Sequence, residues 1–263
     1  MTTEATEATG SGWPVGDPST ACLVLDFDGV LAPIVEDPAT SAMPDATREV
    51  LHRLAGLVGR VAIVSGRPAS FLAERVGVVG AELVGLYGLE RVVDGEVVPD
   101  DRVEPFLDDL DAARGALAGA VAEWPGAELE DKGRALAVHW RRATDREGAA
   151  RALGEAVRAA SGELAVEDGK MVVELRPPVQ ADKGTAVAAL ADGYADVAYA
   201  GDDLGDLPAF AEVARRGGLA VAVDHGEETD DRVREAGTIV VDGTDGVIAW
   251  LEAVADRVQG RSA

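Results

Sequence analysis

The strongest constraint on the fold is a set of short apolar runs, each ending in acidic or hydroxyl residues. Residues 21–26, ACLVLD, form one such run, and residues 61–68, VAIVSGRP, form a second. A continuous apolar run is typical of a strand buried on both faces of a parallel sheet. Between the two runs, the apolar residues of 44–59 recur at helical spacing. Strand, helix and strand in this order predict an α/β fold with a doubly wound, Rossmann-like parallel sheet.

The alternation is interrupted in the middle of the chain. Residues 92–98, VVDGEVV, predict a short hairpin that turns at Asp94-Gly95. The pattern then changes to helix, strand, strand, helix, strand, strand, and α/β alternation returns after Pro177-Pro178. We therefore predict four segments: a flexible tail at 1–19, a first core part at 20–102, an inserted α+β cap domain at 103–178 and a second core part at 179–263.

Composition excludes several classes of partner. The chain of 263 residues is 47% hydrophobic and carries a formal net charge of −24, which disfavours binding to nucleic acid or to an anionic membrane. Its single cysteine, Cys22, suits a reducing compartment. The first twenty residues resemble neither a signal peptide nor a membrane anchor. We expect a cytoplasmic protein, and nothing in the sequence implies a protein partner.

Carboxylates gather where two predicted strands end. Asp26 and Asp28 project from the same side of an extended backbone at the end of the first run. The segment GDDLGD, after a later strand, adds three more aspartates: Asp202, Asp203 and Asp206. Carboxylates that repel one another at one edge of a sheet suit a hard cation, and Mg²⁺ takes carboxylate, water and phosphate oxygens. Aspartates that only cap turns are the alternative, and the occurrence of both motifs on matching strand ends favours the metal.

Groups that could hold a phosphate follow the same pattern. Ser65 and Gly66 end the second predicted strand and offer a hydroxyl and backbone N–H groups, while Lys183 begins a predicted helix. Lysine is rare here, with only three among 24 basic residues. Each feature alone is weak evidence, but four strand-end motifs in the order DxDG, S, K and GDD indicate phosphate chemistry.

These four motifs resemble those of the haloacid dehalogenase superfamily, whose phosphatases carry them in this order. The resemblance implies that Asp26 is the nucleophile, which becomes an aspartyl phosphate, and that Asp28 is the general acid and base. It implies that Ser65 and Lys183 hold the phosphoryl oxygens. It also implies a Mg²⁺ site, formed or surrounded by Asp26, the carbonyl of Asp28, Asp202, Asp203 and Asp206.

The inserted segment carries alternating charged residues. Within ELEDKGRALAVHWR, Glu130 and Lys132 share one face of a strand, as do His139 and Arg141. Within GKMVVELRP, Lys170 and Glu174 share a face opposite the apolar positions. A polar face of mixed charge suits a neutral polyhydroxylated ligand, because hydroxyl groups both donate and accept. A solvated sheet face with surface ion pairs is the alternative.

The patterns ExKxxxxxxHxR, GKxVxExRP, the later KG and GDDxxD resemble those of trehalose-6-phosphate phosphatases over about residues 21–255. The resemblance implies Mg²⁺-dependent hydrolysis of trehalose 6-phosphate, with the cap domain binding the sugar. It implies that the substrate-binding residues are Glu130, Lys132, Arg141, Lys170 and Glu174, and we add Arg67 and His139 as candidates. The partner would be a small-molecule sugar phosphate.

The sequence departs from the family pattern at three places. Val30 follows DxDG where the family has Thr, Tyr87-Gly88 replaces His-Gly, and the segment after Asp206 is less acidic, with Gly205, Leu207 and Pro208. These departures leave open a phosphatase of another disaccharide or pseudo-disaccharide phosphate. Val30 also motivates a phosphosugar mutase, and a phosphorylation-switch domain is a third alternative that the paired aspartates oppose.

Overall fold

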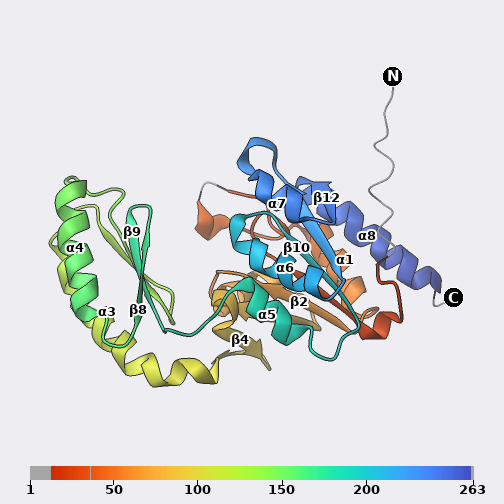
Figure 1. Ribbon diagram of the computed structural model, residues 1–263, viewed down its shortest axis with the longest axis horizontal. Helices are drawn as coiled ribbons and strands as arrows, with labels where there is room; N and C mark the ends of the chain where they lie inside the picture. The colour runs from red at the N-terminus through yellow and green to blue at the C-terminus, as the bar shows by residue number, and fades with distance from the viewer. Residues whose placement is uncertain (1–12, 36, 262–263) are drawn as a thin grey trace. The chain divides into compact units, whose positions relative to one another are not determined.

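The computed structural model describes residues 13–35 and 37–261, which form two compact units (Figure 1). The core unit comprises the described residues up to Val98 and from Ala181 onward, and the inserted unit is Pro99–Gln180. Within the described residues, no helix combines the length and the apolar character needed to cross a membrane. The α/β class predicted from the sequence is confirmed, with an inserted unit between two parts of the core.

An eight-stranded sheet forms the centre of the core unit, in the order β12-β11-β10-β1-β2-β3-β4-β5. The six strands from β12 to β3 pair in parallel, and β4 pairs antiparallel to β3. The strands are β1 (Ala21–Leu25), β2 (Arg60–Val64), β3 (Ala81–Gly85), β4 (Glu90–Val93), β5 (Glu96–Pro99), β10 (Asp196–Gly201), β11 (Leu219–Asp224) and β12 (Ile239–Asp242).

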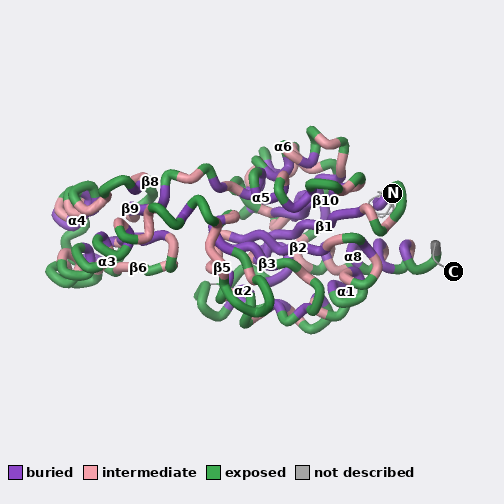
Figure 2. Tube along the Cα trace, turned by 90° about the horizontal axis from the view of Figure 1, so that it is seen from below, coloured by how far each residue is buried: buried purple, intermediate pink, exposed green. Residues whose placement is uncertain are grey.

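Helices cover both faces of this sheet. Figure 2 shows α5 and α6 on one side of the buried strands and α1, α2 and α8 on the other. The helices are α1 (Asp45–Ala55), α2 (Ala69–Val76), α5 (Lys183–Leu190), α6 (Leu207–Arg215), α7 (Asp231–Ala236) and α8 (Gly243–Arg261). Short 3₁₀ helices are η1 (Pro18–Thr20), η2 (Pro38–Thr40), η3 (Leu86–Gly88), η5 (Leu204–Asp206) and η6 (Gly226–Glu228).

Strand β1 shows why the apolar run is continuous. Leu23 and Leu25 belong to the apolar cluster that includes residues of α1 and α8, whereas Cys22 and Val24 belong to the cluster that includes residues of α5 and α6. Alternate side chains therefore enter different cores, and both faces of the strand must be apolar. The thiol of Cys22 is fully buried, and burial raises its pKa to about 12.

The hairpin between β4 and β5 turns where the sequence predicted. Asp94 has φ of 52° and Gly95 has φ of 84°, so both central residues lie in the left-handed region. A two-residue turn of this kind matches the twist of antiparallel strands, which explains the Asp-Gly pair.

The inserted unit is a four-stranded antiparallel sheet, in the order β6-β7-β9-β8, packed against two helices. Its elements are η4 (Asp101–Phe106), α3 (Leu107–Ala122), β6 (Glu128–Asp131), β7 (Leu136–His139), α4 (Arg146–Ala160), β8 (Ala165–Gly169) and β9 (Val172–Arg176). The first α-helix of this unit begins at Leu107, after the 3₁₀ helix η4. Pro105 lies in the preceding 3₁₀ turn, and its missing N–H disfavours the interior of an α-helix.

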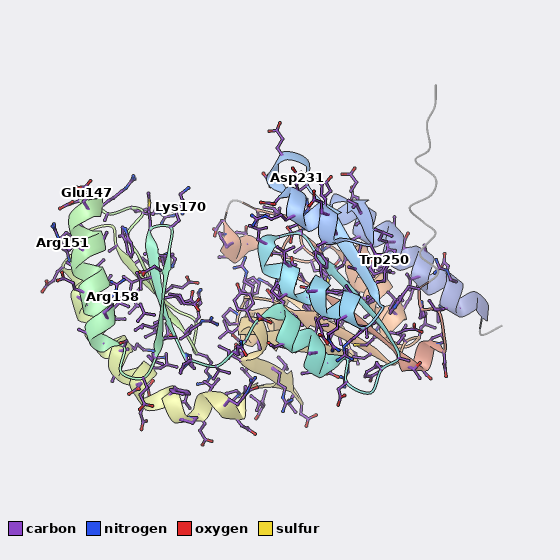
Figure 3. The ribbon with its side chains drawn as sticks, in the orientation of Figure 1. Glu147, Arg151, Arg158, Lys170, Asp231 and Trp250 are labelled. Carbon is purple, nitrogen blue, oxygen red and sulfur yellow. The ribbon has the colours of Figure 1, made fainter. Side chains whose placement is uncertain are left out.

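The predicted flexible tail is only partly within the described chain. Residues 1–12 lie outside it, whereas Trp13 is only 3% exposed and belongs to the main apolar cluster. Its ring lies 6.5 Å from that of Trp250, which Figure 3 labels on α8, and its carbonyl accepts a hydrogen bond from Arg257. Trp13 is therefore packed onto the core, whereas Val15, Gly16 and Asp17 are exposed.

We expect Trp13→Ala to destabilise the core unit by about 3 kcal/mol, because a buried aromatic ring is replaced by a cavity. Urea unfolding followed by circular dichroism measures this change. Val15, two residues along and 78% exposed, supplies the matched control, and Val15→Ala should change stability by less than about 0.5 kcal/mol. Equal effects of the two substitutions would show that the segment is not anchored by Trp13.

Candidate active site

The candidate site lies at the carboxyl ends of the central strands. From β1 the chain proceeds through β2 and β3 on one side, and later through β10, β11 and β12 on the other. Ligands in such sheets bind where the strand order reverses, which here is between β1 and β10. Asp26 follows β1, Ser65 follows β2, and Asp202 follows β10. Parallel pairing of these strands thus brings the sequence-predicted motifs to one edge.

Lys183 is the cation at the centre of the carboxylates. It is the first residue of α5, which Asp182 caps by accepting from Thr185. Its ammonium lies 2.9 Å from Asp26 and 2.6 Å from Asp206, and the side chain is only 4% exposed. Asp203 lies farther away, at 3.7 Å, and is largely exposed. A buried lysine needs paired charges to remain ionised, and here it has them.

The carboxylate of Asp206 is completely buried and surrounded by donors. Its Oδ1 accepts from the ammonium of Lys183 at 2.6 Å and from the hydroxyl of Tyr199 at 2.5 Å. Its Oδ2 accepts from the backbone N–H groups of Asp202 at 2.8 Å and Asp203 at 2.9 Å. Asp206 thereby joins the lysine to the backbone of the GDD loop.

Crowding of the carboxylates changes their acidity. Burial raises the pKa of Asp202 to about 7, with further contributions from the negative charges of Asp206 and Asp203. Burial also raises the pKa of Asp26 well above its ordinary value, although Lys183 opposes the effect. Burial lowers the pKa of Lys183, but Asp26 and Asp206 more than compensate, so that it lies above its usual range. The site therefore has an excess of negative charge that a cation would relieve.

A divalent cation fits the arrangement. Oxygens of Asp26, Asp202 and Asp206 all lie within 4.8 Å of one another. Since Asp206 already accepts four hydrogen bonds, Asp26 and Asp202 are the carboxylates best able to bind a metal. One or two carboxylates with water and phosphate oxygens are what Mg²⁺ usually binds.

Gly29 permits the close approach of the DxDG turn to the GDD loop. It has φ of 73°, and a Cβ atom there would lie 2.0 Å from Oδ2 of Asp202. Its carbonyl accepts from Nε2 of His225 at 2.7 Å, and the same nitrogen lies 3.7 Å from Oδ2 of Asp202. The glycine of the motif is thus required both by its backbone conformation and by the space that Asp202 occupies.

The carboxylate of Asp28 has different partners. Arg67 binds it through both oxygens, at 2.8 and 3.0 Å, and the hydroxyl of Ser41 donates to it at 2.8 Å. Arg67 also stacks over the ring of Phe71, at 4.6 Å. In this arrangement Arg67, a predicted substrate-binding residue, contacts a predicted catalytic one.

The serine motif lies beside Tyr87. The hydroxyl oxygen of Ser65, which is 2% exposed, accepts from the N–H of Arg67 at 3.1 Å. A Cβ atom on Gly66 would lie 2.5 Å from the hydroxyl oxygen of Tyr87. Tyr87 itself has φ of 60°, a conformation that costs energy for a residue with a side chain. The departure from His-Gly therefore lies against the predicted phosphate-binding turn.

In the inserted unit, one sheet face carries most of the predicted sugar-binding residues. Glu130, Ala137 and Glu174 are in register across β6, β7 and β9, so their side chains share a face. Lys132 pairs with Glu174 and His139 pairs with Glu130, both at 3.0 Å. The opposite face, with Val138 and Val173 among others, packs against α3 and α4.

Three of the predicted residues in the inserted unit lie outside the strands, and one of them, Lys132, follows β6 directly. Arg141 is in the turn after β7, and Lys170 is in the turn between β8 and β9, where Figure 3 shows it at the hairpin tip. The next residue, Met171, has φ of 64°, which breaks the strict alternation expected from Lys170 to Glu174. The side chains of Arg141 and Lys170 are both exposed.

Three polar residues at the core site were not found from the sequence. Ser41 lies in a loop without periodicity, and His225 follows β11 by a single residue, so neither had a pattern to mark it. Tyr199 had a signal, because its hydroxyl interrupts the otherwise apolar run VAYA before GDD. A buried hydroxyl requires a hydrogen-bond partner.

Comparison with known proteins agrees with this geometry. The sequence profile of the trehalose-phosphatase family matches residues 24–238. The chain is 33% identical over 242 residues to the trehalose-6-phosphate phosphatase of Escherichia coli, covering 89% of this chain and 86% of that protein.

The chain belongs to the trehalose-phosphatase family.

Two further relatives differ in how much of their own length this chain covers. A probable trehalose-phosphate phosphatase of Sinorhizobium fredii is 36% identical, with 76% of this chain and 77% of that protein covered. An uncharacterized glycosyl hydrolase of Mycobacterium tuberculosis is 38% identical over 223 residues, covering 79% of this chain but 16% of that protein. The chain thus corresponds to a small part of that longer relative.

Solved structures show the same fold. A crystal structure of a trehalose-6-phosphate phosphatase related protein has a TM-score of 0.72 at 23% identity, with 91% of this chain and 99% of that chain covered. The C-terminal domain of the Candida albicans trehalose-6-phosphate phosphatase has a TM-score of 0.66 at 21% identity, covering 90% and 93%. The family predicted from the sequence motifs is confirmed.

We expect Gly29→Ala to weaken Mg²⁺ binding at least about tenfold, because the new methyl group displaces Asp202. Titration calorimetry with Mg²⁺ alone measures the affinity. Gly95→Ala is the matched control: Gly95 also has a positive φ, of 84°, but a Cβ atom there meets nothing within 4 Å. Both variants should lose about 1 kcal/mol of stability from the left-handed backbone conformation, and Gly29→Ala should lose more because its methyl group displaces Asp202. A similar loss of Mg²⁺ affinity in both would contradict the interpretation.

Mg²⁺ binding should depend on pH because a protonated Asp202 must release its proton to bind a cation. With the pKa of Asp202 at about 7, affinity should fall about tenfold for each unit of pH below 7 and level off above it. Calorimetry in buffers of different ionisation enthalpy should detect proton release at pH 6 and little at pH 8. An affinity that is constant from pH 5.5 to 8 would contradict the role of Asp202.

Proposed function

We propose that this protein is a Mg²⁺-dependent phosphatase that hydrolyses trehalose 6-phosphate to trehalose and phosphate through an aspartyl-phosphate intermediate. The observation that carries the proposal is the buried contact between Asp26 and Lys183, at 2.9 Å, beside Asp202 at the switch point of the sheet. In a member of the trehalose-phosphatase family, this arrangement suits transfer of a phosphoryl group to a carboxylate.

The proposed first step is attack by a carboxylate oxygen of Asp26 on phosphorus. A bond forms between that oxygen and phosphorus, and the bond from phosphorus to the sugar oxygen breaks. Asp28 donates a proton to the departing sugar oxygen. In the second step, Asp28 takes a proton from water, the water oxygen attacks phosphorus, and the carboxylate of Asp26 is released with inorganic phosphate.

Charge compensation is the main requirement of this chemistry, because a carboxylate and a phosphate monoester repel each other. Lys183 already neutralises part of the charge of Asp26. The carboxylates of Asp26 and Asp202, with the main-chain carbonyl of Asp28, would hold Mg²⁺. The bound ion would neutralise charge on the phosphoryl oxygens as it develops in the transition state.

The remaining groups at the sheet edge would bind the phosphoryl group. The hydroxyl of Ser65 and the N–H of Gly66 follow β2 directly and can donate to phosphoryl oxygens. Arg67 now binds the carboxylate of Asp28 through two hydrogen bonds. It could bind a phosphate in the same way, because a phosphate also offers two acceptor oxygens to a guanidinium group.

The polar face of the inserted unit supports a sugar as the rest of the substrate. The charged groups of this face form two pairs, Lys132 with Glu174 and His139 with Glu130. The face therefore offers both donors and acceptors and does not require a charged ligand. Hydroxyl groups of a disaccharide can bond to both kinds of group. Arg141 and Lys170, in adjoining turns, complete the proposed sugar-binding set.

The burial of Val30 bears on the mutase alternative. Its side chain is fully buried in the main apolar cluster, so the replacement of Thr by Val changes core packing at this position. The reason for considering a mutase therefore loses force. Release of inorganic phosphate supports the phosphatase, whereas interconversion of sugar phosphates without release would support the mutase.

The test is phosphate release, in Mg²⁺, from trehalose 6-phosphate, sucrose 6-phosphate, glucose 6-phosphate and an aryl phosphate. We expect kcat/KM for trehalose 6-phosphate to exceed the others by about a hundredfold, or ~3 kcal/mol. Asp26→Asn should abolish release, because its side chain is a poor nucleophile. Equal rates on all four substrates, or a preference for another sugar phosphate, would contradict the assignment of substrate.

A pair of variants separates sugar recognition from chemistry. Glu174→Gln should lower kcat/KM for trehalose 6-phosphate about tenfold. It should leave kcat/KM for the aryl phosphate within about twofold of the wild-type value. Asp168→Asn is the matched control, because Asp168 lies on the neighbouring strand β8 and pairs with Arg158, which Figure 3 labels on α4. The control should leave both substrates unchanged.

A further inference from the structure

The hydroxyl of Tyr199, on β10, is a buried polar group that the proposed chemistry does not use. The side chain is completely buried, and its ring packs edge-on against Phe210 at 5.7 Å. Phenylalanine would serve this packing equally well. A hydroxyl group in such a position costs free energy unless it is hydrogen-bonded, and here it donates to Oδ1 of Asp206 at 2.5 Å.

The bond to Tyr199 completes the coordination of Asp206. Each carboxylate oxygen then accepts two hydrogen bonds: Oδ1 from Tyr199 and Lys183, and Oδ2 from the backbone of the GDD loop. A carboxylate with four donors is fixed in orientation. Gly201 makes room for it, since a Cβ atom there would lie 2.3 Å from Cγ of Asp206.

The position of Lys183 depends on this orientation. Its ammonium is shared between Asp206, at 2.6 Å, and Asp26, at 2.9 Å. Without the donor from Tyr199, Oδ1 of Asp206 would have the lysine as its remaining side-chain partner and would attract it more strongly. The ammonium would then be drawn from the carboxylate that attacks phosphorus.

We propose that Tyr199 is a positioning residue: its hydroxyl saturates Oδ1 of Asp206 and so keeps the ammonium of Lys183 shared with Asp26. Asp206 in turn serves as an anchor for Lys183 and the GDD loop, and the metal is left to Asp26 and Asp202. The inference rests on the proposed phosphatase function for its kinetic consequence, and on the hydrogen-bond geometry alone for its structural one.

The kinetic test compares Tyr199→Phe with wild type on trehalose 6-phosphate in saturating Mg²⁺. We expect kcat to fall about tenfold while KM and the Mg²⁺ affinity stay within about twofold. Tyr194→Phe is the matched control, because the hydroxyl of Tyr194 donates to the carbonyl of Gly59 at 3.3 Å in an exposed position, and it should retain full activity. An unchanged kcat in Tyr199→Phe would overturn the proposal.

A double-mutant comparison shows whether Tyr199 acts through Asp206. In an Asp206→Ala background, which lacks the acceptor oxygen, Tyr199→Phe should cause no further loss of kcat. If Asp206→Ala does not fold, Asp206→Leu provides the background, because leucine also lacks the acceptor oxygen. A further tenfold loss in the background variant would show that the tyrosine acts independently and would overturn the proposal.

A readout without activity keeps this inference separate from the proposed function. In urea unfolding without Mg²⁺, Tyr199→Phe should lower the midpoint in wild type but not in Asp206→Ala, where the acceptor of its hydroxyl is gone. If wild type releases no phosphate from any substrate, the proposed function fails, but the unfolding comparison still decides the role of Tyr199. Equal midpoint shifts in both backgrounds would overturn it.

Discussion

The structure depends on the repulsion between carboxylates that meet where strands β1 and β10 end. Parallel pairing of these two strands brings Asp26 and Asp202 to one edge of the sheet, and their negative charge has to be balanced. The rest of the site follows from this constraint: Lys183 enters at the start of α5, Asp206 is held by four donors, and Gly29 leaves space for Asp202. Placing so many negative charges together lowers the stability of the folded protein, and a bound cation would reduce their repulsion.

The inserted unit differs from the core unit in that its sheet has one apolar and one polar face. Its apolar face packs on two helices, while the polar face pairs its own charges: Lys132 with Glu174, and His139 with Glu130. Partly exposed pairs of this kind contribute little to stability, and they can be exchanged for bonds to a ligand at low cost. In the proposed function, the core unit would supply charge compensation and the inserted unit would supply hydrogen bonds to the sugar.

The sequence predicted the parts of this site that lie at strand ends better than the parts that depend on side-chain orientation or on loops. Continuous apolar runs identified the core strands, and motifs directly at strand ends needed only parallel pairing to come together, as Asp26 and Asp202 do. The pairing of Arg67 with Asp28 depends on side-chain orientation, which no spacing encodes. The positive φ of Met171 leaves Lys170 in the turn before β9, which the alternation of side chains did not indicate. Ser41 and His225 come from loops that tertiary packing brings to the site.

The burial of Cys22 between β1 and the α5–α6 layer has a practical consequence. The only thiol of the chain is withdrawn from solvent, and its high pKa keeps it protonated at neutral pH, so reagents that need an exposed thiolate will not modify it. Cysteines introduced on the surface, one in the core unit and one in the inserted unit, could therefore carry spectroscopic labels while the native residue remains in place. The separation of the units, with and without a sugar phosphate, becomes measurable in otherwise unaltered protein.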